Sequence, residues 1–392
     1  MGTTHTELEQ ETIRICQDLI RIPSVNFGDG KGDEKAVAEY VAGLLSEVGI
    51  KNTIYESAPG RCNVIARIKG KNPNRPGLVV HGHIDVVPAN SDDWSVDPFG
   101  AEIKDGFIWG RGAVDMKNMD AMILATVRDW ARTGYIPERD IVLAFFADEE
   151  AGSIYGSHFI VKDHPEVFAG CTEAVSEVGG FSVTVAGGKR LYLIETAEKG
   201  IHWMRLTAQG RAGHGSMMND DNAITHLSEA VAKIGRFEWP QRYSKTVKAF
   251  FKRIAEETGQ PYDEKDLRPL LKEIGFASTM IGATLQNTAN PTMLESGYKA
   301  NVIPGAASAT IDGRFIPGFE EELNATIKSL IGDNIKVETI TRDKALEVPF
   351  EGDLVEAMCN ALIKQDSVAI PVPYVMSGGT DNKALADLGI IG

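Results

Sequence analysis

Hydrophobic residues recur along this chain with two different periods, and the change of period separates helices from strands. In the first half, helical spacing predicts helices at 7–22, 35–48, 116–133 and 154–162. Alternating or continuous apolar runs predict strands there at 51–55, 63–68, 140–147, 172–178 and 191–196. The Asp105-Gly106 pair predicts a hairpin within 101–110. Because strands and helices alternate, we expect an α/β domain with a mixed, largely parallel sheet.

The segment 77–88, GLVVHGHIDVVP, combines an apolar run with polar residues at its end. His81, His83 and Asp85 follow the run at alternate positions, and alternate residues of a strand share one face. A buried strand would therefore deliver imidazole and carboxylate groups from its carboxyl end. His83 is our candidate metal ligand in this segment.

Four acidic residues follow later segments that would return to the same sheet edge. Asp115 ends the stretch WGRGAVD, Glu149 and Glu150 follow the apolar strand IVLAFFAD, and Glu177 closes the strand EAVSEV. In open α/β sheets, ligands bind beyond the carboxyl ends of the strands. A single site at that edge is the most economical interpretation.

Each of these positions, taken alone, also fits a structural role. His83 with Asp85 could form a surface pair, and Glu149 with Glu150 could be solvated acids. Asp115 could be a helix N-cap, and Glu177 could be an exposed strand end. Only the combination favours a site.

The pattern changes in the second half of the chain. It predicts first a strand at 202–209, a helix at 222–234 and a polar helical insertion at 243–274. A strand pair that ends at Arg314, a helix at 319–331 and a strand at 336–340 follow. Without the insertion this order is βαββαβ, the ferredoxin-like arrangement. The helix at 351–365 and the strand at 371–374 return to the first pattern. We therefore predict a catalytic domain, 1–197 and 346–392, interrupted by an inserted domain at 198–345.

Composition narrows the function. The net charge of −15, from 40 basic and 55 acidic residues, disfavours binding to nucleic acids and anionic membranes. Four cysteines without CxxC spacing argue against a disulfide framework and against a thiolate zinc site, and fit a cytoplasmic location. We find no apolar segment of the roughly 20 residues needed to span a bilayer. Neither a G-x-S-x-G nucleophile motif nor a G-x-G-x-x-G dinucleotide motif is present.

Histidine and carboxylates without cysteine suit zinc or a related divalent metal in a hydrolytic site. Asp115 is our candidate bridge between two ions, as in two-metal aminopeptidases. Asp85 would accept the second ring proton of His83 and fix its tautomer. At a bend after a strand, one residue of the Glu149-Glu150 pair would bind metal while the other faces water.

Six motifs together resemble one family. They are HGHIDVVP, GRGAVDMKNMDA, ADEEAGS, RAGHGSMMNDDNAI, NVIPGAASATIDGRFIPG and SGGTDNK. In this order they resemble the co-catalytic dizinc metallopeptidases and deacylases, which include carboxypeptidase G, acetylornithine deacetylase, succinyl-diaminopimelate desuccinylase and aminoacylase-1. The resemblance covers nearly the whole chain. It implies a zinc-peptidase α/β domain interrupted by a ferredoxin-like lid domain, through which a homodimer forms.

The resemblance also implies roles for the residues at the sheet edge. It makes His83 and Glu177 ligands of one ion, Asp115 the bridge and Glu150 a ligand of the other ion. Glu149 becomes the general base. The implied cofactors are two divalent ions, zinc first, with cobalt or manganese as alternatives.

In the inserted domain, the resemblance implies that His214 stabilises the oxyanion, often across the dimer. It implies that Arg314, with Asn301, holds a substrate carboxylate, for which guanidinium offers a planar fork. Gly379 and Thr380 would approach the substrate backbone and donate to a carboxylate. A structural loop histidine, a solvated arginine and a plain turn with a helix N-cap remain the alternatives.

The family pattern is broken at the end of the chain. A ligand histidine is expected some tens of residues beyond the GGTD motif, but the eight histidines end at His226. We interpret this as truncation and expect the Glu150-side ion to bind weakly. The alternatives are a noncatalytic metal- or peptide-binding relative and an inactive fragment.

The predicted function is hydrolysis of an amide bond beside a free carboxylate, in a small peptide or an N-acyl amino acid. Metal-activated water would be the nucleophile and Glu149 the base.

Overall fold

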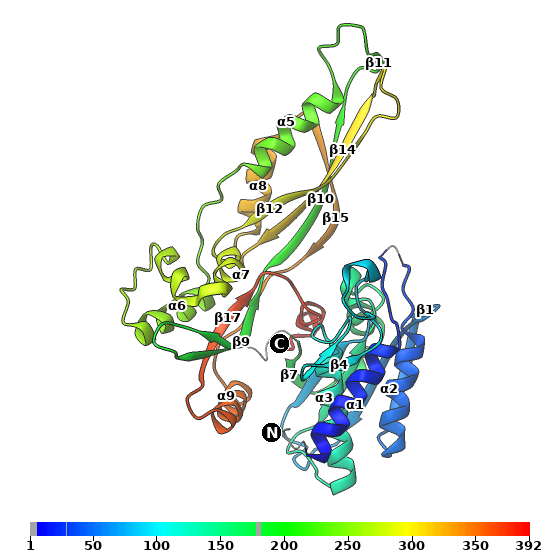
Figure 1. The fold of residues 1–392 in the computed structure, drawn as a ribbon, viewed down its shortest axis with the longest axis vertical. Coiled ribbons are helices and arrows are strands. Elements are labelled where there is room, and N and C mark those ends of the chain that lie inside the picture. The colour runs from blue at the N-terminus through cyan, green and yellow to red at the C-terminus, as the bar shows by residue number, and fades with distance from the viewer. Residues whose placement is uncertain (1–5, 29, 178–181) are drawn as a thin grey trace. The chain divides into compact units, whose positions relative to one another are not determined.

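The computed structural model describes residues 6–28, 30–177 and 182–392 and divides into two compact units (Figure 1). The first unit consists of Met1–Glu177 with Thr380–Gly392, and the second of Val178–Gly379. These boundaries differ from the predicted ones at 197 and 345. The difference comes from the helices of the inserted segment that pack on a second sheet of this unit, described below.

The first unit is built around a five-stranded sheet in the order β1-β2-β6-β3-β7. The strands are β1 (Asn52–Ala58), β2 (Arg61–Ile68), β3 (Gly77–His83), β6 (Ile141–Phe146) and β7 (Cys171–Val175). The β1-β2 and β2-β6 pairs are antiparallel, whereas β6-β3 and β3-β7 are parallel. The sheet is therefore mixed, but it is not the largely parallel sheet that we predicted. The hairpin around Asp105-Gly106 is present as β4 (Glu102–Lys104) and β5 (Phe107–Trp109).

Helices pack against both faces of this sheet. They are α1 (Glu7–Arg21), α2 (Lys35–Glu47), α3 (Lys117–Thr133), α4 (Ser157–Asp163) and α10 (Asn382–Leu385). Gly82 of β3 faces α3, because a Cβ on it would lie 2.6 Å from Cε of Met116, the residue that precedes α3. Val79, three residues earlier on the same strand, lies on the opposite face, where it shares a core with Ile160 of α4 and Leu385 of α10. His81 and His83 alternate with Gly82, so they lie on the α10 face.

The second unit contains an antiparallel sheet in the order β12-β14-β10-β15. Its strands are β10 (Gly200–Gln209), β12 (Thr288–Ser296), β14 (Ala306–Phe315) and β15 (Ile335–Asp343). One face carries α5 (Ala223–Gly235) and α8 (Glu320–Ile331), whose Leu227 and Leu323 share a core with Leu206 of β10 (Figure 1). The element order is the βαββαβ order that the sequence predicts. A two-stranded ribbon, β11 (Gly213–His214) with β13 (Val302–Ile303), adjoins this sheet.

A separate sheet in the second unit explains its boundaries. Here β9 (Arg190–Glu198) pairs in parallel with β17 (Ile370–Met376) and antiparallel with β8 (Ser182–Thr184) and β16 (Leu346–Glu347). The helical segments α6 (Lys245–Thr258), η4 (Arg268–Ala277) and α7 (Ser278–Gly282) pack on it, and α9 (Asp353–Gln365) precedes β17. The predicted polar insertion thus has a buried apolar face, which includes Phe250 and Phe251. Through this packing, segments on both sides of 198–345 that we assigned to a catalytic domain are grouped with the inserted segment in one compact unit.

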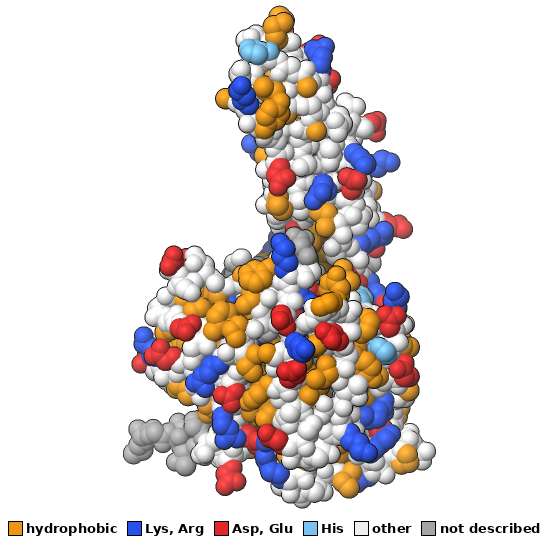
Figure 2. All heavy atoms as spheres, turned by 90° about the vertical axis from the view of Figure 1, so that its right-hand side faces the viewer, with side chains coloured by type: hydrophobic (Ala, Val, Ile, Leu, Met, Phe, Trp, Pro, Cys, Tyr) orange, Lys and Arg blue, Asp and Glu red, His pale blue; other side chains and the backbone are white. Residues whose placement is uncertain are grey.

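On the face that Figure 2 draws, acidic, basic and hydrophobic side chains are interspersed. This face offers no stripe of Lys and Arg for a nucleic-acid backbone. Among the described residues, no helix is long and apolar enough to cross a membrane.

Candidate metal centre

His83 stands at the carboxyl end of β3, between parallel neighbours on both sides. Its side chain is 1% exposed, and Asp85 is fully buried. A surface His-Asp pair, one of the alternatives that the sequence left open, is therefore wrong. A buried imidazole needs partners on both ring nitrogens.

Three carboxylates approach the outer nitrogen of the His83 ring. Nε2 lies 3.0 Å from Oδ1 of Asp115, 3.6 Å from Oε2 of Glu177 and 3.8 Å from Oε2 of Glu149. One ligand atom from each of His83, Glu149 and Glu177 falls within 4.8 Å of the others, and the same holds for His83, Asp115 and Glu150. The structure thus brings the four predicted acidic residues together around the His83 imidazole.

Asp115 reaches this cluster from the residue pair before α3. The helix begins at Lys117 after an N-cap residue, Met116, and no side chain makes a capping hydrogen bond there. The Asp115–Met116 peptide is cis. The Asp115 carboxylate accepts from the His83 ring at 3.0 Å and is 64% exposed, so it faces the site and is not an N-cap.

Asp85 does more than the predicted orientation of His83. Nδ1 of His83 lies 3.0 Å from the Asp85 carbonyl oxygen and 3.4 Å from its Oδ1. The Asp85 carboxylate also accepts the backbone N–H of Glu149 at 3.1 Å and of Glu150 at 3.2 Å. One carboxylate therefore holds both the ring and the turn that carries the two glutamates.

The electrostatics of the cluster indicate an excess of negative charge. Burial alone would lower the pKa of His83, but the charge of Glu177 and hydrogen bonds to Asp115 and Asp85 raise it well above its usual value. Burial, with the charges of Glu177 and Asp381, raises the pKa of Glu149 well above 4.5. Burial likewise raises the pKa of Glu150 to about 7. A divalent cation would compensate these crowded carboxylates, and imidazole with carboxylate is a donor set that zinc accepts.

The segment at the end of the GGTD motif packs against the same face of β3 as the cluster. Nε2 of His81 is 2.8 Å from Oδ1 of Asn382, and burial lowers the pKa of His81 to about 4, so the ring is neutral. Oδ1 of Asp381 accepts from the Ser157 hydroxyl at 2.5 Å. Oγ1 of Thr380 accepts the Asn382 N–H at 3.2 Å, as a residue at a helix start does. The predicted contact of Gly379 and Thr380 with a substrate stays a prediction.

The second unit separates the predicted lid residues into two groups. His214 pairs with Val302 in the β11-β13 ribbon, and the carbonyl of Asn301 accepts the Gly215 N–H at 2.8 Å. Arg314 pairs with Ile201 at the other end of β10 and β14, so it is not next to Asn301 in one chain. A joint Asn301-Arg314 subsite within one chain is therefore not formed.

Both groups already have polar partners within the second unit. Nδ1 of His214 is 2.8 Å from the Ser216 hydroxyl, and the imidazole is exposed. The Arg314 guanidinium donates twice to Asp312, at 2.7 and 3.2 Å, and lies over the Trp203 ring. Asp312 and Trp203 thus orient the arginine fork.

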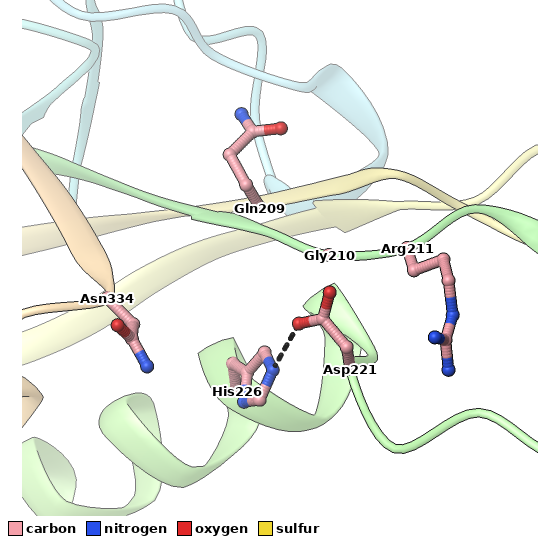
Figure 3. A pocket seen from close by; sticks show the side chains of 6 residues that line it. All are labelled: Gln209, Gly210, Arg211, Asp221, His226 and Asn334. Carbon is pink, nitrogen blue, oxygen red and sulfur yellow. Dashed lines mark hydrogen bonds and ion pairs between the residues drawn. The ribbon is translucent and has the colours of Figure 1, made fainter.

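A hollow of about 420 Å³ lies between the end of β10 and α5 in the second unit (Figure 3). It is lined by Gln209, Gly210, Arg211, Asp221, His226 and Asn334. Nε2 of His226 donates to Asp221 at 3.1 Å, so these two lining residues are hydrogen-bonded to each other. None of the predicted site residues lines this hollow.

Asp120 is a buried acid that the sequence did not single out. It lies on α3 behind β3, and a Cβ on Gly82 would be 2.4 Å from its Oδ1. Neither carboxylate oxygen has a hydrogen-bond partner among the described residues. Burial raises the pKa of Asp120 from 3.8 to about 8. The folded protein therefore binds this proton more tightly than the unfolded chain does.

This carboxyl predicts a pH dependence of stability. Because the pKa of Asp120 is raised in the folded state, its stabilising contribution is complete below about pH 4 and is lost as the pH rises towards 8. Between pH 5 and 8, we expect the free energy of unfolding of the Asp120→Asn variant to fall less than that of the wild type. The difference between the two decreases should be about 1–3 kcal/mol. Urea unfolding of metal-free protein measures this, with Asp129→Asn on the same helix as control. Equal pH slopes for wild type and Asp120→Asn would contradict the prediction.

Sequence reasoning missed a second set of buried residues beneath the Glu149-Glu150 turn. Asn26, Glu34 and Arg61 are at most 4% exposed and connect to Asp85 and Asp148. Their separation along the chain hides them, since Asn26 and Asp148 are 122 residues apart. The only available signal is a charged residue at the start of a strand whose other residues are mostly apolar, such as Arg61 in RCNVIARI.

Comparison with known proteins gives a family match over most of the chain. The model of "Peptidase family M20/M25/M40" matches residues 79–390. Aminoacylase-1 from Sus scrofa is 28% identical over 348 residues, which span 87% of this chain and 75% of the relative. The N-fatty-acyl-amino acid synthase/hydrolase PM20D1 from Xenopus tropicalis is 26% identical over 400 residues, 97% of this chain and 77% of that protein.

Solved structures share the fold. The M20 family metallo-carboxypeptidase Sso-CP2 from Sulfolobus solfataricus superposes with a TM-score of 0.73 at 19% identity, over 99% of this chain and 90% of that one. Human carnosine dipeptidase 1 gives a TM-score of 0.70 at 14% identity, over 99% and 91% of the two chains. The mixed α/β architecture is therefore that of these metallopeptidases.

Proposed function

The chain belongs to peptidase family M20/M25/M40, and on that premise we propose that it hydrolyses an amide bond next to a free carboxylate. As a member, it is a hydrolase of the peptidase or amidohydrolase type. The substrate would be a small peptide or an N-acyl amino acid. The observation that carries the proposal is the convergence of Asp115, Glu149 and Glu177 on Nε2 of the buried His83.

Metal-dependence is a property of the family, and the donor set of this chain fits it. His83, Asp115 and Glu177 would hold one divalent ion, and Asp115 with Glu150 would contribute to a second. Zinc suits these imidazole and carboxylate donors best. When bound, such ions polarise a carbonyl and make water acidic enough to attack at neutral pH.

Glu149 would act as the general base. Its carboxylate lies 3.8 Å from Nε2 of His83, is 15% exposed, and belongs to a turn that the Asp85 carboxylate holds. From this place it would take a proton from the attacking water and pass it to the leaving amine. Its neighbour Glu150 belongs to the second cluster of candidate ligands, with His83 and Asp115. Adjacent glutamates thereby serve different roles.

Residues of the second unit would complete the reaction. His214 would stabilise the oxyanion that forms on the scissile carbonyl, and Arg314 would bind the substrate carboxylate. Because His214 and Arg314 lie at opposite ends of one sheet, we propose that a homodimer supplies them from two chains. A noncatalytic binding role is not favoured, because the related proteins are enzymes by name.

A substrate panel tests this function. We expect zinc-loaded protein to hydrolyse dipeptides or N-acyl amino acids with a free carboxylate, and their carboxyl-terminal amides at least about tenfold more slowly. Arg314→Met should raise KM for the free carboxylates and narrow this difference. Equal rates for acids and amides would contradict carboxylate recognition, and no hydrolysis of any panel member would contradict the function.

A further inference from the structure

The turn that carries Glu149 and Glu150 depends on an unusual residue before it. Asp148 follows β6 with a backbone φ of 67°, in the left-handed region that most side chains avoid. Its Oδ2 accepts the Tyr155 N–H at 3.0 Å, which closes the loop on itself. Its Oδ1 faces inward. The direction of both glutamates thus depends on what holds Asp148.

Asn26 connects Asp148 to the residue that holds His83. Its Nδ2 donates to Oδ2 of Asp85 at 2.8 Å and to Oδ1 of Asp148 at 3.0 Å, so both amide hydrogens are used. Its Oδ1 accepts the Gly28 N–H at 3.0 Å, which fixes the orientation of the amide. Asp85 in turn accepts the N–H groups of Glu149 and Glu150. One amide nitrogen therefore joins the two carboxylates that define the turn.

Arg61 supplies the positive charge for this group. Its Nη2 donates to Oδ1 of Asp148 at 2.5 Å, and its Nε lies 3.0 Å from Oε2 of Glu34. The guanidinium is 1% exposed, and a Cβ on Gly32 would lie 1.8 Å from Nη1, so a side chain at this position would displace the guanidinium. Without Arg61, the buried side chains of Glu34 and Asp148 would lose the cation that they share.

We propose that Asn26 and Arg61 are positioning residues of the metal centre. They act through Asp85 and Asp148 and set the directions in which Glu149 and Glu150 project. The inference rests on the proposed function, in which one glutamate is the base and the other a ligand. Losing such supporting partners lowers metal affinity or activity by about 10–100-fold, and a misplacement of about 1 Å lowers the rate by about 100-fold.

Two conservative variants and one matched control test the proposal. Arg61→Lys keeps the charge but loses the fork, and Asn26→Ser shortens the side chain and removes the amide that donates to both Asp85 and Asp148. We expect each to lower kcat by about 10–100-fold with little change in KM, and to weaken zinc binding measured by chelator competition. Arg67→Lys is the control, because Arg67 lies on the same strand and pairs with Asp140 at the opposite end of β6. It should leave kcat and zinc affinity unchanged.

A double variant separates positioning from simple stabilisation. Glu34→Met with Arg61→Met replaces the ion pair by apolar side chains, which often preserves stability. The proposal predicts that kcat and zinc affinity stay low even where the melting temperature of the metal-free protein recovers. Wild-type kcat and zinc affinity in this variant, or equal losses in Arg61→Lys and Arg67→Lys, would overturn it. If the wild type hydrolyses nothing, the proposed function fails, and the zinc competition still decides the positioning role.

Discussion

Replacing Glu149 by Gln should abolish most of the hydrolysis while leaving the metal in place. The amide keeps the shape of the side chain but cannot accept the proton of water. General bases contribute about 10²–10⁴-fold to rate, and we expect kcat to fall by that factor with KM nearly constant. Steady-state kinetics on a cleaved panel substrate, with the metal content of the same preparation, measures both effects.

The adjacent glutamate provides the sharpest control for this prediction. Glu150→Gln should lower the metal content, because Glu150 groups with His83 and Asp115. Glu166→Gln, at an exposed carboxylate outside the site, should change neither quantity. Glu149 also groups with His83 and Glu177. A loss of metal in Glu149→Gln equal to that in Glu150→Gln would therefore make Glu149 a ligand and contradict its role as base.

His214→Ala should also cause a large loss of turnover. Removing one oxyanion-stabilising donor costs about 10²–10³-fold in kcat, and metal content should be unaffected because His214 belongs to the second unit. The exposed ring, hydrogen-bonded to Ser216, is available to a second chain. His226→Ala is the matched control, since His226 forms an ion pair with Asp221 in the same region.

Mixing two inactive variants decides which chain uses His214. If His214 serves the partner, a mixed dimer of Glu149→Gln and His214→Ala chains has one intact site. An equal mixture, after exchange of subunits, should then regain about a quarter of the wild-type activity, because half of the dimers are mixed. If His214 acts within its own chain, every site stays defective and the mixture stays inactive. That result would contradict the dimeric arrangement.

The sequence predicted that the candidate ligands lie close together, but it did not predict the packing that divides the chain into compact units. The alternate spacing of His81, His83 and Asp85 follows directly from the pleat of β3, so one face could be identified from the letters alone. The boundary at 197 differs from the division into compact units, because the sheet of β9 and β17 shares a core with α6, η4 and α7 from the segment 198–345. Packing between segments so distant in sequence leaves no local signal.

The buried polar residues were the other omission. Arg61 and Asp120 look like ordinary charged residues within a strand and a helix, and only the packing around them shows that they are buried. Buried Arg61 forms an ion pair with Asp148, and burial raises the pKa of Asp120. Likewise, Arg314 is separated from Asn301 because the continuous strand β14, Ala306–Phe315, carries Arg314 to the end far from the β11-β13 ribbon.

The most direct test is a zinc titration of the metal-stripped chain with hydrolysis measured at each step. Wild-type protein should be inactive in excess chelator and gain activity against a dipeptide or N-acyl amino acid in proportion to bound zinc. Glu149→Gln should bind zinc over the same range without turnover. Hydrolysis that persists in the stripped protein, or its absence from fully loaded wild type, would contradict a metal-dependent hydrolase centred on His83.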